Sequence, residues 1–175
     1  MSPGAESAPH RGTAILAGRS LLGATWFALN FFVVMPGLVL WFTGTEFWPP
    51  PGASRGLGIA VIGAAHVLLF VQVRAFVIRG RGTHVPIDPP RTLIEDGLYA
   101  YVRNPMYSIY VIIALGEAIL YRSLALAGYA ALLWGVAHAY VVGVEEKVLR
   151  RRFGDAYDTY VLRAGRWRPR RRPSS

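Results

Sequence analysis

The chain has 175 residues, of which 53% are hydrophobic, and it carries a net charge of +9 and no cysteine. This length is that of one domain, and the apolar content exceeds what a soluble domain needs, so we expect an integral membrane protein. The lack of cysteine excludes disulfides, thiolate metal sites, iron–sulfur clusters and cysteine lipidation.

Four apolar runs follow a polar N-terminal segment. Residues 1–18 are rich in Ser, Ala, Gly and Pro, which is typical of a flexible tail, and a single domain is expected over residues 19–170. The apolar runs cover residues 21–42, 57–78, 106–120 and 124–144, and only the third falls clearly short of the roughly 20 residues that cross ~30 Å of hydrocarbon. The sequence therefore predicts an all-α fold, an integral membrane bundle of four transmembrane helices. The first run is expected to be a retained span, because it is too long for the core of a signal peptide.

The connections between these runs differ in character. A proline-rich turn joins the first two runs, and residues 121–123 join the last two as an antiparallel helical hairpin. The segment between the second and third runs is too polar to span and too long for a simple turn, as functional loops often are. After the fourth run, apolar side chains recur at near-helical spacing, broken around Gly154. This pattern predicts a cytoplasmic amphipathic helix along the membrane surface, followed by a basic tail at residues 171–175.

The positive charge is distributed unevenly along the chain. Its eighteen arginines and one lysine lie mostly in the two terminal segments and in the segment between the second and third runs, whereas the other two connections hold only Arg55 and Arg122. By the positive-inside rule both termini and the middle segment are cytoplasmic, which requires an even number of spans. Because the arginines flank helices of hydrocarbon length, we expect membrane lipids and no nucleic acid as their partners.

Two polar constellations are expected to meet at the cytoplasmic side. Arg103, Asn104 and Pro105 precede the third run, and Glu145 and Glu146 follow the fourth. The predicted hairpin brings these two ends together, offset by about 10 Å along the helix axes at ~1.5 Å per residue. An arginine can bind a carboxylate through two hydrogen bonds, and glutamates accept from amines or hydroxyls, so the pair suits a small zwitterionic ligand. On the residues alone the alternative stays open that these are flanking and helix-end charges.

The motifs around these residues resemble those of a known superfamily. "GLYAYVRNPMY" is followed in order by "EE", "FGDAYDTY" and "RW" with a nearby proline, over about residues 80–170. This combination resembles the isoprenylcysteine carboxyl methyltransferase and phospholipid methyltransferase superfamily. The resemblance implies a multi-pass enzyme of the cytoplasmic membrane of a bacterium that uses S-adenosylmethionine. Prenylcysteine enzymes usually have histidine where Asn104 stands, whereas asparagine is common in phospholipid-type and bacterial branches.

The resemblance also implies roles for individual residues. Cofactor binding would fall to Gly97, Tyr99, Arg103, Asn104, Pro105, Tyr107, Glu145, Glu146, Tyr157, Tyr160 and Trp167. Catalytic roles would fall to Arg103, Glu145, Glu146 and Arg166. An amine acceptor would lose its proton to Glu145 or Glu146, and a carboxylate acceptor would be oriented by Arg103 or Arg166. The acceptor is expected to be lipophilic: a phospholipid amine, a prenylcysteine-type carboxylate, a lipidated molecule or another lipid.

Polar residues also occur inside the apolar runs. Asn30, His66 and Glu117 lie at one predicted depth, and His138 lies nearer the cytoplasmic end of its run. A glutamate at that depth requires a partner, and His66 is the expected one. Asn30, His66 and Glu117 form either the floor of a substrate cavity or a hydrogen-bonded clamp between helices, and His138 either faces the cofactor or packs.

Three other functions are consistent with parts of the sequence. A haem bound by His66 and His138 is the first, although the heights of the two residues disagree. An NADPH-dependent reductase of the sterol-reductase type is the second, because such enzymes are more distant relatives of the same superfamily. A non-catalytic helical bundle is the third. No metal site is expected.

Overall fold

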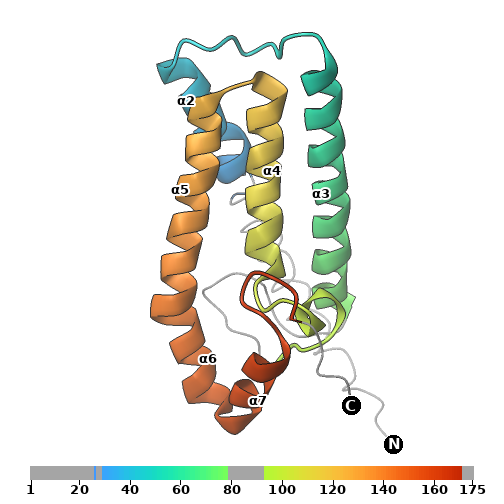
Figure 1. Ribbon diagram of the computed structural model, residues 1–175, viewed down its shortest axis with the longest axis vertical. Helices are drawn as coiled ribbons and strands as arrows, with labels where there is room; N and C mark the ends of the chain where they lie inside the picture. Colours follow the sequence, from blue (N-terminus) through green and yellow to red (C-terminus); the bar gives the residue numbers. More distant parts are fainter. Residues whose placement is uncertain (1–25, 27–28, 79–92, 171–175) are drawn as a thin grey trace, which may run out of the picture.

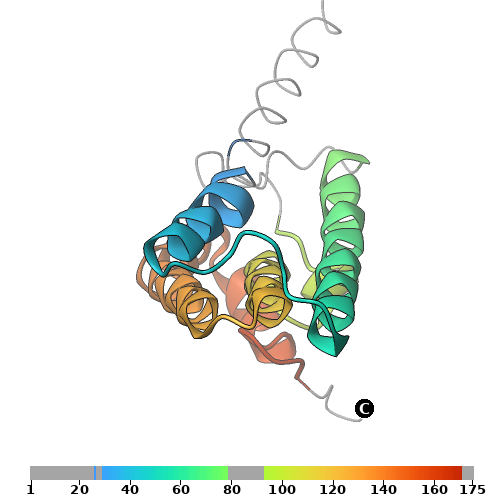
Figure 2. The same cartoon turned by 90° about the horizontal axis from the view of Figure 1, so that it is seen from above.

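The described part of the chain is helical. The computed structural model describes residues 26, 29–78 and 93–170, and these residues form no β-strand. Four helices lie alongside one another, and two shorter helices lie at one end of the bundle (Figure 1). The elements are the π-helical turn η1 (Asn30–Val34), α2 (Met35–Phe42), α3 (Ala53–Ile78), the 3-10 turn η2 (Gly97–Ala100), α4 (Pro105–Tyr121), α5 (Leu124–Tyr140), the π-helical turn η3 (Val141–Glu145), α6 (Glu146–Phe153) and α7 (Asp155–Arg163). Viewed from above, α4 lies between α3 and α5, and α2 packs on α5 (Figure 2).

Two helices of the described residues are long and apolar enough to cross a membrane. They are Ala53–Arg74 within α3 and Leu124–Phe153, which joins α5, η3 and α6 into one continuous helix. Only 17% and 22% of their apolar windows are buried inside the structure, so most of these apolar side chains face outward, as they would toward lipid. Two shorter apolar helices are also present. Asn30–Phe42 ends where the first run was predicted to end, and Pro105–Tyr121 agrees with the third run to within one residue at each end. The four-span arrangement therefore stays a prediction, and the N-terminal part of the first run, both tails and the arginines at 79–91 lie outside the described residues.

The turn between α4 and α5 forms the predicted antiparallel hairpin. Arg122 occupies the left-handed region with φ of 50°, and Ser123 caps α5 by accepting a hydrogen bond from the Leu126 amide at 3.3 Å. The Arg122 guanidinium donates to Ser54 Oγ at 2.7 Å and to the Pro51 carbonyl at 3.3 Å, which ties this turn to the start of α3. Because the turn fixes one end of the hairpin, the start of α4 and the end of α5 meet at the other end.

The helices α3 and α4 approach closely at glycines. A Cβ at Gly58 would lie 2.7 Å from the Leu120 backbone, and one at Gly116 would lie 2.7 Å from an Ile62 side-chain carbon. Small residues at such positions allow helix backbones to approach in membrane proteins. The contact between α3 and α4 therefore depends on the absence of these side chains.

Gly58→Ala is expected to lower the free energy of unfolding by about 1–3 kcal/mol, because the added methyl group meets backbone that moves only with the whole helix. Thermal unfolding of the detergent-purified protein, followed by circular dichroism, measures the effect. Gly63→Ala is the matched control, since a Cβ at Gly63 in the same helix meets nothing within 4 Å. Equal unfolding temperatures for the two variants would contradict the proposed close contact.

The C-terminal region forms two short helices where an amphipathic helix with a break in its apolar spacing around Gly154 was predicted. Gly154, with φ of 51° and ψ of −128°, ends α6 and starts α7, so the predicted break at this glycine is confirmed. The helix α6 continues α5, and α7 turns back against the segment before α4 (Figure 1). Tyr157 and Tyr160 of α7 are buried in a cluster with Ala164, and this cluster also contacts Leu93, Leu149, Phe153 and Val161. This packing places the last described residues beside the start of α4.

Candidate functional site

The site is built where three segments distant in sequence meet. Residues 164–170, here called the C-terminal strap, pair with the residues before α4 in a short parallel bridge between Val102 and Gly165. The Arg103 amide donates to the Gly165 carbonyl at 2.7 Å, and the Gly165 amide donates to the Tyr101 carbonyl at 3.1 Å. The third segment is the junction of η3 and α6. The predicted meeting of the start of the third run with the end of the fourth is thus confirmed.

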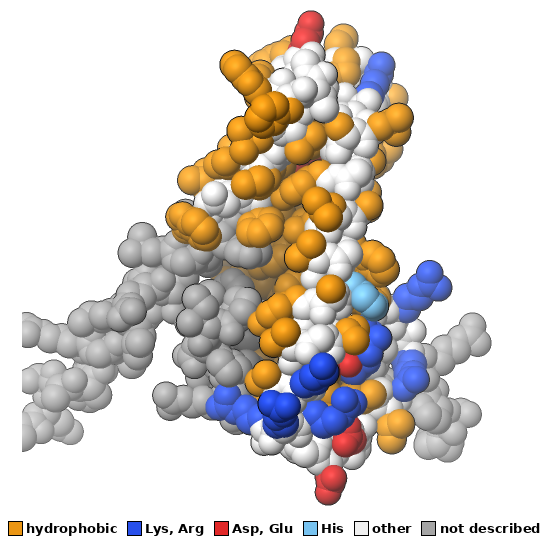
Figure 3. Space-filling model, turned by 90° about the vertical axis from the view of Figure 1, so that its left-hand side faces the viewer, with side chains coloured by type: hydrophobic (Ala, Val, Ile, Leu, Met, Phe, Trp, Pro, Cys, Tyr) orange, Lys and Arg blue, Asp and Glu red, His pale blue; other side chains and the backbone are white. Residues whose placement is uncertain are grey.

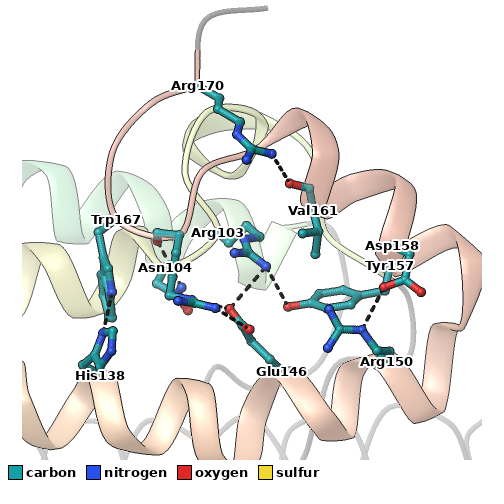
Figure 4. Close-up of polar contacts among 11 residues, drawn as sticks. Arg103, Asn104, His138, Glu146, Arg150, Tyr157, Asp158, Val161, Trp167 and Arg170 are labelled. Atoms are coloured by element: carbon teal, nitrogen blue, oxygen red, sulfur yellow. Dashed lines mark hydrogen bonds and ion pairs between the residues drawn. The ribbon is translucent and has the colours of Figure 1, made fainter.

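Glu146 is the centre of an ion cluster that joins these segments (Figure 4). Its Oε1 lies 3.2 Å from Arg103 Nη1, and the side chains of both residues are 9% exposed. Arg166 of the strap donates from Nε to Oε1 at 2.6 Å and from Nη2 to Oε2 at 2.9 Å, a two-pronged contact of the strong type. These hydrogen bonds raise the pKa of Arg166 above its ordinary value. Two guanidinium groups share one carboxylate, so the cluster carries an excess positive charge.

Arg103 retains an unsatisfied donor in this cluster. Its Nη1 donates to the Tyr157 hydroxyl at 3.4 Å, but its Nε is buried and has no hydrogen-bond partner among the described residues. A buried unpaired donor costs free energy, and such groups are rare unless a ligand or a water completes them. The free N–H and the excess charge together suit an anionic group of a ligand.

Glu145 has a different partner from its neighbour. The Tyr107 hydroxyl of α4 donates to Glu145 Oε2 at 3.0 Å. The two glutamates lie at a π-helical turn, in which the Glu146 amide bonds to the Val141 carbonyl five residues earlier. Such turns change the helical register and occur often at functional sites. Glu146 is therefore the partner of two cations, Arg103 before α4 and Arg166 of the strap, whereas Glu145 is the partner of the neutral Tyr107 phenol in α4.

The remaining motif residues before α4 support this arrangement. Asn104 Nδ2 donates to the Arg166 carbonyl at 3.1 Å, so its amide holds the strap, and Pro105 is buried at the first position of α4. Gly97 has φ of 61° at the start of η2, and the Tyr160 hydroxyl donates to the Tyr99 carbonyl at 2.8 Å. Burial raises the pKa of Tyr160, so its hydroxyl stays a donor near neutral pH.

His138 joins the strap to α5. The Trp167 indole Nε1 donates to His138 Nδ1 at 3.0 Å, and the two rings lie 6.0 Å apart with Trp134 stacked on the histidine at 5.3 Å. An indole nitrogen only donates, so Nδ1 is unprotonated and a neutral His138 carries its proton on Nε2. This contact between the histidine and the strap was not among the expectations from sequence.

The other three polar residues of the apolar runs do not come together. Asn30 donates to the Trp26 carbonyl at 2.8 Å, and His66 is exposed, with Nδ1 2.8 Å from the Ile62 carbonyl of its own helix. Glu117 is buried, and its Oε2 has no partner among the described residues. The structure shows no hydrogen bond between Glu117 and His66, so the expected pair is not formed. Within the described ranges, no cluster of three or more His, Asp or Glu side chains is arranged to hold a metal ion.

The chain matches a known family over most of this architecture. The sequence model of the phospholipid methyltransferase family matches residues 53–156, which run from the start of α3 into α7. The match includes Arg103, Asn104, Tyr107, Glu145 and Glu146, whereas the strap with Arg166 and Trp167 lies beyond it. No curated protein sequence matches the chain.

Proposed function

Since the chain belongs to the phospholipid methyltransferase family, a family of membrane methyltransferases, we propose that it transfers a methyl group from S-adenosylmethionine to a lipophilic acceptor. The observation that carries the proposal is the unpaired, buried Nε of Arg103 within an ion cluster of excess positive charge. A carboxylate such as that of the methionine part of the donor fits this group, because a guanidinium binds carboxylates with strong, directional hydrogen bonds. The sulfonium supplies an activated methyl group when the donor is bound.

The chain's own residues would hold and shield the donor. Arg103 would bind its carboxylate, and Glu145 is the acceptor available for an amine or a ribose hydroxyl, since Glu146 already holds two arginines. The strap would close the site, because Asn104 and Glu146 hold it against the start of α4. The remaining residues proposed to contact the donor lie in the segments around Arg103 and Glu146. They are Gly97, Tyr99, Pro105, Tyr107, Tyr157, Tyr160 and Trp167.

Transfer of the methyl group requires little acid–base catalysis by the protein. Displacement at a sulfonium carbon proceeds in line, so alignment and exclusion of water supply most of the rate enhancement, up to about 7–11 kcal/mol by effective-molarity arguments. If the acceptor is an amine, its proton would pass to Glu145, whose carboxylate is held by one neutral donor. If the acceptor is a carboxylate, Arg166 would orient it.

The position of the site fits a reaction between a soluble donor and a membrane-bound acceptor. Glu145 and Glu146 follow directly after the apolar part of the Leu124–Phe153 helix, at the end of the bundle where α6 and α7 lie. We also propose that the protein crosses the cytoplasmic membrane of a bacterium several times and that this end of the bundle faces the cytoplasm. The family match gives no support to the reductase, the haem protein or the non-catalytic bundle.

Arg103→Ala is expected to weaken binding of S-adenosylhomocysteine by about tenfold to a hundredfold, the effect of losing one charged hydrogen bond to a ligand carboxylate. Calorimetric titration of the detergent-purified protein measures it. Arg55→Ala is the matched control, because Arg55 lies at the start of α3, at the other end of the bundle, where its guanidinium lies over the Trp48 ring. Absence of binding by a folded wild type would refute the proposed donor, and equal affinities of the two variants would refute the role of Arg103.

A further inference from the structure

The helix α6 has two faces with different surroundings. Leu149 and Phe153 pack inward against the buried tyrosines of α7, and Glu146 points into the site. Because contacts of the inner face fix the rotation of the helix, the opposite face is turned outward. That face carries Lys147, Val148 and Arg151 of α6, at the spacing i, i+1 and i+4 of one helix side, and the exposed Val144 of η3 comes directly before it in the chain.

This outer face combines exposed apolar and basic side chains. Val144 is 47% exposed and Val148 is 40% exposed, and Lys147 and Arg151 are exposed as well. In the part of the chain that the structure describes, neither cation has an ion pair, whereas nearby Arg150 pairs with Asp158 and Arg163 pairs with Glu95. The positive charge of the face is therefore not neutralised by the described residues of the protein.

The face lies where the bilayer would end. The Leu124–Phe153 helix has 30 residues, and about 20 of them suffice to cross the hydrocarbon, so its last residues reach the headgroup region. Figure 3 shows hydrophobic side chains covering most of the length of the bundle and lysine and arginine side chains gathered at this end. Valines at such a level would contact the first acyl carbons, and long basic side chains would extend to the phosphates.

We propose that the face formed by Val144, Lys147, Val148 and Arg151 binds the headgroup of an anionic phospholipid. Two adjacent cations favour an anionic over a zwitterionic headgroup, since the zwitterion's own amine repels them. The bound lipid would hold α6 from outside while Glu146, the immediate neighbour of Lys147, holds it from inside. Lipid composition would thereby influence the position of both glutamates. This inference depends on the membrane position of the helix and not on the identity of the methyl donor.

The test is a titration of the full-length protein in detergent with phosphatidylglycerol that carries a fluorescent acyl chain, compared with phosphatidylcholine carrying the same label. Wild type is expected to bind phosphatidylglycerol at least about tenfold more tightly, and the difference should shrink as salt is added. The double variant Lys147→Glu/Arg151→Glu is expected to lose this preference. The neutral variant Lys147→Gln/Arg151→Gln is expected to weaken the preference for phosphatidylglycerol. This variant replaces the charge-reversal variant if the latter does not fold.

The matched control is Arg171→Glu/Arg172→Glu, which changes the net charge equally in the basic tail and should leave the preference unchanged. Equal affinity of wild type for both lipids would overturn the proposal, as would loss of the preference in the tail variant to the same extent as in the α6 variant. Tight binding of a DNA duplex through Lys147 and Arg151 without a lipid preference would overturn it in favour of a nucleic-acid surface. Binding of S-adenosylhomocysteine, measured on the same samples, reports separately on the donor site.

Discussion

Glu146→Ala is expected to lower the free energy of unfolding by about 3–5 kcal/mol, the effect of leaving a buried charge without its partner. Arg103 would stay in a site where its side chain is 9% exposed, and its guanidinium would have only the neutral Tyr157 hydroxyl as a hydrogen-bond partner among the described residues. Arg166 would lose both of its contacts, so the strap would lose an anchor as well. Denaturant unfolding in detergent, followed by circular dichroism, measures the change.

Two further variants separate the buried cluster from charge removal in general. Asp158→Ala removes the acceptor of Arg150 where both side chains are about half exposed, and should cost less than about 1 kcal/mol. Adding Arg103→Met to Glu146→Ala removes the uncompensated charge and should recover part of the lost stability. If Glu146→Ala destabilises no more than Asp158→Ala, the cluster contributes little to folding.

The meeting of the Arg103 and Glu146 segments was predictable because it follows from helix boundaries and a short turn, whereas the direct ion pair at 3.2 Å was not predicted. The apolar runs end in polar residues, and only three residues separate the last two runs, which leaves antiparallel packing as the geometry available. The structure confirms the helices and their hairpin, and with them the meeting of the two charged ends. The lengths of apolar runs and of the connections between them predict local structure and the packing of helices that follow each other in the chain.

The different partners of the two glutamates were not predictable from the same patterns. Glu145 and Glu146 are chemically alike, and the residue types do not indicate the π-helical turn before them, or that Glu145 contacts Tyr107 while Glu146 contacts the arginines. The position of Arg166 and the contact between Trp167 and His138 depend on how the chain reverses at Gly154 and returns to Val102. Long-range backbone pairing of this kind leaves no periodic signal in the sequence. The expected Glu117–His66 pair failed for a related reason, since equal depth along two helices does not fix which sides face each other.

Gly165→Ala is expected to reduce the proposed methyl transfer by at least about a hundredfold, because displacement of groups in a preorganised site by about 1 Å can cost that much. A Cβ at Gly165 would collide with the backbone carbonyl of Arg168 in the same strap. The backbone of the strap would have to change between Gly165 and Arg168, so Arg166 and Trp167, which lie in this stretch, would be displaced from their partners together. Transfer of labelled methyl from S-adenosylmethionine to a membrane lipid extract measures the activity.

The effect on stability should be smaller than the effect on activity, which distinguishes strap displacement from unfolding. Tyr157 and Tyr160 of α7 form a buried cluster with Ala164, the first residue of the strap, and this cluster should keep α7 in place. Faster amide hydrogen exchange confined to residues 164–170 would show the movement independently of any assay for methyl transfer. Gly128→Ala is the control, because Gly128 lies in the first half of α5, away from the site, and a Cβ there meets nothing within 4 Å. Unchanged exchange and activity in Gly165→Ala would show that the strap tolerates the added methyl group. The expected link between the position of the strap and activity would then be wrong.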